Sequence, residues 1–183
     1  LAINTNGGDI VMNANWTGSS EPAAIALSSA QLNSGSGSIT LTGFSADSGG
    51  VLLADTQLDA SGSGAVAITG VGQNSQMNGG PGVQLFGASI DTQDGNIAVH
   101  GHVQDQSAAA SQAGVHVDSD SWIVSETGDL DLVGSAGSTD AGSAGIRIGG
   151  RVEATGGHVS LRASNDGNVD ALVIEPGSPG VRA

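Results

Sequence analysis

The sequence predicts an all-β fold, a right-handed parallel β-helix of about six coils with roughly 30 residues in each. Three observations lead to this prediction. A short glycine-led block recurs along the whole chain, its aliphatic residues alternate with a period of two, and a third apolar position precedes each glycine by a nearly constant gap. Alternation of this kind is typical of strands with one buried face.

The first block is a glycine followed by two aliphatic residues at alternate positions, as in Gly37–Leu41. It occurs six times, and its glycines are 29, 27, 31, 33 and 29 residues apart. The six glycines are Gly8, Gly37, Gly64, Gly95, Gly128 and Gly157. Each block predicts a short strand whose two aliphatic side chains point to the same face.

A second block follows each first block and is an aliphatic pair at spacing two. The pairs are Ile25/Leu27, Val51/Leu53, Val83/Leu85, Val115/Val117, Ile146/Ile148 and Leu172/Ile174. The third apolar positions are Leu32, Leu58, Ile90, Ile123 and Val152, which lie 5, 6, 5, 5 and 5 residues before the next glycine. Length varies mainly between the first and second blocks, as expected for a surface loop on a fixed scaffold.

Three short strands cannot bury their inner faces alone, so we expect the units to coil and stack about 4.8 Å apart. Glycines before the first strand and at its exit are expected to permit the sharp corners of such a coil. The exit glycines are Gly43, Gly70, Gly101 and Gly134. A β-sandwich gives no reason for six in-phase units, and a propeller needs about four strands per blade.

We therefore predict one repeat domain over residues 1–183. Its units lie near residues 8–36, 37–63, 64–94, 95–127, 128–156 and 157–183. Ile3 and Val181 match the third apolar position of the coils before and after these units. This phase predicts that the segment belongs to a longer array, or that copies stack end to end into a filament.

The composition limits both the core and the partners. The chain has no Tyr, two Phe and two Trp, so we expect Val, Ile, Leu and Ala to fill the core. The net charge of −14 predicts repulsion of nucleic acid and of anionic membrane surfaces. No stretch approaches the roughly 20 apolar residues of a membrane span, so no membrane insertion is expected.

Stretches such as Gly37–Gly43 followed by Gly50–Leu58 resemble the repeat arrays of the filamentous-haemagglutinin class of large bacterial exoproteins. The resemblance is one of repeat style and covers essentially all 183 residues. It implies a right-handed parallel β-helix, secretion to the bacterial cell surface, and a role in adhesion or biofilm. The partners it implies are adjoining repeats of the same or neighbouring chains, and host-cell or matrix glycans and proteins.

Two pairs of side chains are candidates for binding a metal ion. His100 and His102 lie at positions i and i+2, so their imidazoles point the same way. Asp118 and Asp120 precede a corner, where they could hold Ca²⁺ together with backbone carbonyls. A calcium site needs six or more oxygens, and the sequence places only these two carboxylates together. Our prediction is therefore that the protein has no metal and no cofactor.

A carbohydrate-active enzyme is the alternative from another class, because hydrolases need two carboxylates at a suitable separation. Asp129 and Asp131 share one predicted face, but the chain's few aromatic residues lie in different units. We expect no catalytic residue and a structural or adhesive role instead. The loops Gly72–Gly82 and Val103–Gly114 are the expected places for partner contact.

Overall fold

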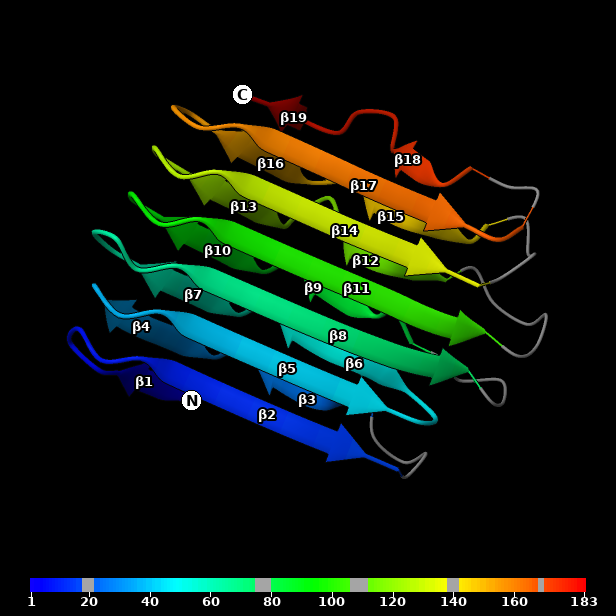
Figure 1. Cartoon of the computed structure of the whole chain (residues 1–183), viewed down its shortest axis with the longest axis horizontal. Coiled ribbons are helices and arrows are strands. Elements are labelled where there is room, and N and C mark those ends of the chain that lie inside the picture. Colours follow the sequence, from blue (N-terminus) through cyan, green and yellow to red (C-terminus); the bar gives the residue numbers. More distant parts are fainter. Residues whose placement is uncertain (18–21, 75–79, 106–111, 138–141, 168–169) are drawn as a thin grey trace.

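A computed structural model describes residues 1–17, 22–74, 80–105, 112–137, 142–167 and 170–183. Within these residues the chain forms strands, turns and bends but no helix, and no helix long and apolar enough to cross a membrane is found there. The strands form three parallel sheets that stack as a β-helix, with the two termini at opposite ends of the stack (Figure 1). The predicted parallel β-helix is confirmed.

The first sheet is the front layer in Figure 1 and contains the long strands that follow the corner glycines. Its strands are β2 (Ile10–Trp16), β5 (Ile39–Ser45), β8 (Val66–Asn74), β11 (Ile97–Asp105), β14 (Leu130–Ala136) and β17 (Val159–Asn165). The register places the aliphatic residues of the six first blocks directly above one another, from Ile10 to Val159. The predicted repeat is therefore also the hydrogen-bonding register.

The second and third sheets lie behind the first (Figure 1). The second sheet consists of β3 (Ala23–Ser28), β6 (Gly49–Ala54), β9 (Val83–Phe86), β12 (Ala113–Val117), β15 (Ala144–Ile148) and β18 (Leu172–Ile174). The third sheet consists of β1 (Ala2–Asn4), β4 (Gln31–Gly35), β7 (Gln57–Ala60), β10 (Ser89–Thr92), β13 (Trp122–Ser125), β16 (Arg151–Ala154) and β19 (Gly180–Arg182). With six strands in each of the first two sheets, five turns of the chain separate six stacked coils.

Inward side chains from all three sheets form one continuous core of aliphatic residues. Leu41, Leu53 and Ile90 illustrate the three contributions, and each is 0% exposed. The four aromatic side chains lie on the surface, and they are Trp16, Phe44, Phe86 and Trp122. The expectation of a core made of Val, Ile, Leu and Ala is thus confirmed. The pairings Ile3–Leu32 and Val152–Val181 confirm the expected phase of these two residues.

Five of the six glycines that precede the first strand lie at close-packed corners, whereas a Cβ atom on Gly8 in the first coil would make only ordinary contacts. A Cβ atom on Gly95 would lie 1.8 Å from the carbonyl oxygen of Gly64 in the preceding coil, so side chains are excluded there. Small hydroxyls complete the corner, because Thr92 Oγ1 donates to the Gly95 carbonyl at 2.7 Å. The corner is thereby compact and its buried carbonyl is satisfied.

The expectation for the exit glycines is wrong. Gly43, Gly70, Gly101 and Gly134 lie inside their strands, where the first sheet passes directly over the second. A Cβ atom on Gly101 would lie 1.9 Å from the carbonyl oxygen of Gly114 in β12. These glycines therefore allow two backbones to approach closely, a role that strand glycines often have, and the chain does not turn there.

Candidate functional site

The outer face of the third sheet carries two open hollows. Residues immediately before the third apolar positions point outward here, because side chains alternate along each strand. The register stacks them in one column across the coils, which contains Ala2, Gln31, Gln57, Ser89, Trp122 and Arg151. An outward column of unequal side chains creates hollows on an otherwise regular surface.

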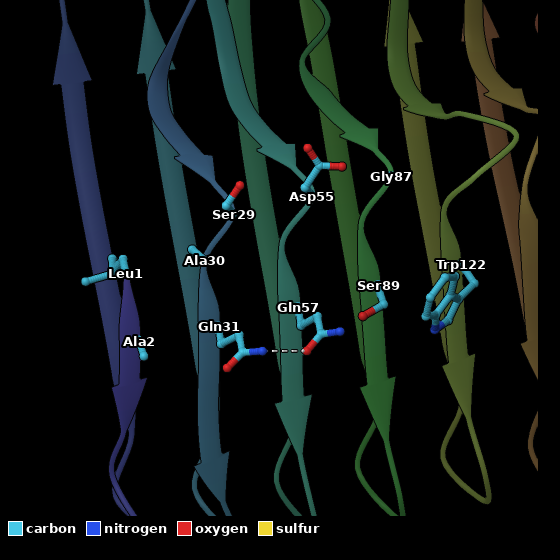
Figure 2. A pocket seen from close by; sticks show the side chains of 10 residues that line it. All are labelled: Leu1, Ala2, Ser29, Ala30, Gln31, Asp55, Gln57, Gly87, Ser89 and Trp122. Atoms are coloured by element: carbon cyan, nitrogen blue, oxygen red, sulfur yellow. Dashed lines mark hydrogen bonds between the residues drawn. The ribbon is translucent and has the colours of Figure 1, made fainter.

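An open groove of about 530 Å³ lies over this column and along the axis of the stack (Figure 2). Gln31 and Gln57 are exposed along it, and the Gln31 Nε2 donates to the Gln57 Oε1 at 3.2 Å. The corner residues Ser29, Asp55 and Gly87 also line it, with φ of 49°, 48° and 58°. This left-handed conformation turns the chain tightly from the second sheet into the third, next to the groove.

Trp122 lies at one end of this groove, and its side chain is well exposed at 41% (Figure 2). Its indole Nε1 donates to Asp91 Oδ2 at 3.2 Å, a hydrogen bond between neighbouring strands of the third sheet. Burial raises the pKa of Asp91 above its ordinary value, and the nearby Asp59 also raises it, whereas the Trp122 bond acts in the opposite direction. The hydrogen bond to Asp91 restrains the orientation of the Trp122 ring.

A second hollow of about 450 Å³ includes Trp122 in its lining, together with Asp91, Asp120 and Arg151. The Arg151 guanidinium is engaged within its own strand, with Nη2 at 2.7 Å from Glu153 Oε2. The same indole therefore takes part in two hollows of one face. This arrangement offers a flat aromatic surface with carboxylates and amides beside it.

Asp118 and Asp120 do not act together in the structure. Asp118 Oδ1 accepts hydrogen bonds from the Gly87 amide at 3.2 Å, the Asp120 amide at 3.2 Å and the Ser121 hydroxyl at 2.7 Å. One carboxylate oxygen thus joins the corner to the preceding coil. Asp120 is exposed and lines the second hollow. Asp118 therefore has a structural role at this corner, which its choice as a calcium candidate did not anticipate.

His100 and His102 both lie on the outer face of β11, as predicted, but they have different partners. The His100 Nε2 is 3.6 Å from Asp131 Oδ2, whereas the His102 Nδ1 is 2.6 Å from the Ser135 hydroxyl. Across the described ranges, no group of three or more His, Cys, Asp or Glu residues could hold a metal ion. Among the described residues, the candidate metal pairs His100/His102 and Asp118/Asp120 therefore gain no third His, Cys, Asp or Glu ligand.

Asp129 and Asp131 lie on one face of the first sheet, as predicted. Asp129 Oδ1 accepts from the His158 amide at 2.9 Å, and Asp131 Oδ2 is 2.5 Å from the Arg162 Nη2. Both carboxylates are therefore bound to the next coil.

The hydroxyl of Ser135 beside His102 could serve as a nucleophile with a base, but the backbone amides around it belong to the sheet ladder. Because these amides already donate to carbonyls of the neighbouring strands, they are not free to stabilise an oxyanion.

The loops expected to contact partners, Gly72–Gly82 and Val103–Gly114, are described only at their ends. Residues 75–79 and 106–111 lie outside the described residues. The prediction that these loops contact partners therefore stays a prediction.

Comparison with known proteins adds no identification, since no protein-family model, no curated protein and no solved structure matches the chain. Sequence reasoning missed the Trp122 face, although a signal was present. Aligning the residues that precede Leu32, Leu58, Ile90 and Ile123 would have placed Gln31, Gln57, Ser89 and Trp122 in one outward column.

Proposed function

We propose that the chain is a structural and adhesive segment of a bacterial secreted or cell-surface protein. One observation carries this proposal: a rigid stack of in-register coils presents open grooves along its axis on the third sheet. The coils share one aliphatic core, so the outer face keeps its shape along the stack. Exposed surface on a rigid scaffold is where binding is expected.

The distribution of polar contacts supports the same proposal. On the first sheet, Asp131 pairs with Arg162 and His102 pairs with Ser135. On the third sheet the Trp122 ring remains well exposed. The first sheet also exposes the Phe44 ring, but on the third sheet a partner would find the exposed Trp122 ring beside two hollows.

Adhesion of coated beads tests the proposal. Beads carrying the purified chain are passed over layers of epithelial cells and over extracellular-matrix coatings, and the retained beads are counted. We expect retention well above that of beads carrying an unrelated acidic protein, and we expect the soluble chain to inhibit it. Equal retention of the two kinds of bead on every surface would contradict the proposal.

A second candidate, a glycan-cleaving enzyme, is favoured by one observation. Asp59 and Asp91 are register neighbours on the outer face of the third sheet, and the pKa of Asp91 is raised. Glycosidases use two carboxylates whose pKa values differ, one as acid and one as base or nucleophile. Release of reducing ends from hexasaccharides, abolished by both Asp59→Asn and Asp91→Asn, would support this candidate. If the wild-type chain released no reducing ends, the enzyme candidate would be refuted and only the binding role would remain.

A further inference from the structure

We infer that the outer face of the third sheet binds neutral oligosaccharides, with Trp122 as the stacking platform. This inference rests on the proposed adhesive function and names the ligand class for it. Trp122 is 41% exposed, yet its Nε1–Asp91 bond of 3.2 Å restrains its orientation, so little side-chain freedom is lost on binding. A flat, apolar, restrained surface is suited to the apolar face of a sugar ring.

The polar groups that line the two hollows match hydroxyl groups. Gln57 offers its amide group as a donor, since its Oε1 already accepts from Gln31, while the carboxylates of Asp55 and Asp91 offer acceptors. Sugar hydroxyls donate and accept, so each of these side chains finds a complementary partner. An extended peptide fits less well, because the backbone groups of β7, β10 and β13 are already paired within the sheet. The amides and carbonyls of such a peptide would find no free strand edge with which to form hydrogen bonds.

The charge of the face selects neutral ligands over acidic ones. Asp55, Asp91 and Asp120 line the two hollows. Arg151 is the basic residue beside them, and its guanidinium is paired with Glu153. An anionic sugar would therefore meet unbalanced carboxylates, which repel it. A cationic ligand could also approach the ring by a cation–π interaction, and the experiment must separate that case.

The direction of the groove sets the size of the ligand. The lining residues Gln31, Gln57 and Ser89 lie on successive strands, which are stacked about 4.8 Å apart. The second hollow continues from Trp122 toward Arg151. A ligand several sugars long, lying along the axis of the stack, could therefore contact the ring and the amides together, and it should bind more tightly than a monosaccharide.

Tryptophan fluorescence tests this inference directly. The chain has two Trp, so Trp16→Phe leaves Trp122 as the sole reporter. We expect a saturable change in emission with neutral hexasaccharides such as cellohexaose, maltohexaose and chitohexaose, and no change with hexagalacturonate. No saturable change with any neutral hexasaccharide would overturn the inference, as would equal binding of hexagalacturonate. Stronger binding of spermine than of every neutral sugar would assign the face to cations and also overturn it.

Variants locate the binding, measured by calorimetry on otherwise wild-type chain. Trp122→Ala should weaken binding about tenfold or more, because aromatic stacking is lost. Phe44→Ala is the matched control, since Phe44 is an exposed aromatic (37%) on the first sheet. It should leave affinity unchanged, and circular dichroism confirms that both variants fold. Equal losses in the two variants would overturn the assignment. Bead adhesion that persists in Trp122→Ala would overturn this inference but leave the adhesive function standing.

Discussion

The first and third sheets share one register and one core, but they differ on both faces. Both sheets bury aliphatic side chains such as Leu41 and Ile123, but the first sheet also approaches the second through close backbone contacts, as at Gly101 and Gly114. On the outside, the first sheet carries the paired side chains of Asp131 and Arg162, whereas the third carries the exposed ring of Trp122. Phe44 keeps an exposed ring on the first sheet too, so the difference teaches that a uniform ladder can carry two outer faces with different side chains around their aromatic rings.

The largest effect is expected where the first sheet touches the second. Gly101→Ala would place a Cβ 1.9 Å from the Gly114 carbonyl oxygen, so the two sheets would have to separate. We expect the free energy of unfolding to fall by about 3 kcal/mol or more, the upper end of overpacking effects. Urea denaturation measures it.

The matched control is Ala163→Gly, because Ala163 occupies the same column as Gly134 but in the last coil. That change removes a methyl group and adds backbone freedom, so a loss of roughly 0.5–1 kcal/mol is expected. If Gly101→Ala lowered the free energy of unfolding by as little as Ala163→Gly, the two sheets could separate easily. The contrast between the first and third sheets would then be wrong.

Removing a buried side chain of the third sheet should destabilise the protein by leaving a cavity, whereas Gly101→Ala destabilises it by overpacking. Ile123 is 0% exposed, so Ile123→Ala should cost about 2–5 kcal/mol through lost burial and a residual cavity. Val124 is the next residue and faces outward, so Val124→Ala should cost about 0.5 kcal/mol or less. Thermal or urea unfolding of the pair checks the prediction, and equal costs would refute the inward and outward assignment.

How much the sequence could predict is clear from these residues. Ile123 and its counterparts were placed in register by the repeat alone, because burial imposes alternation on every coil. The role of Gly101, which lets the first sheet approach the second closely, was not predictable, since contact between two sheets depends on the path of the chain in space. The column that contains Trp122 could be read from the same alignment of repeats, but the hollows beside it were not predictable, because their lining comes from corners and strands of several coils.

A smaller effect is expected at the corner between the second and third sheets. Asp118→Ala removes the carboxylate oxygen that receives donors from Gly87, Asp120 and Ser121, so a loss of about 1–3 kcal/mol is expected. Asp120→Ala, at an exposed carboxylate, should change stability by about 0.5 kcal/mol or less. The reverse order of the two losses would mean that Asp118 does not hold the corner.

The smallest effect is a pH dependence on the third-sheet face. The pKa of Asp91 is raised above 3.8, so the folded protein holds this proton more tightly than the unfolded chain does. The stability from this group is present below pH 3.8 and is lost as the pH rises through the folded pKa. The free energy of unfolding of Asp91→Asn relative to wild type should therefore increase over that window and then level off. A difference that falls with rising pH would contradict the burial of Asp91.

Amide chemical-shift mapping of the 17.7 kDa chain tests most directly which face is open to a ligand. Spectra of the ¹⁵N-labelled protein are recorded with and without the neutral hexasaccharide that binds most tightly. The account predicts that the largest shifts fall on β7, β10, β13 and β16 of the third sheet, around Trp122. Largest shifts on β11 and β14 of the first sheet, around His100 and Asp131, would contradict it.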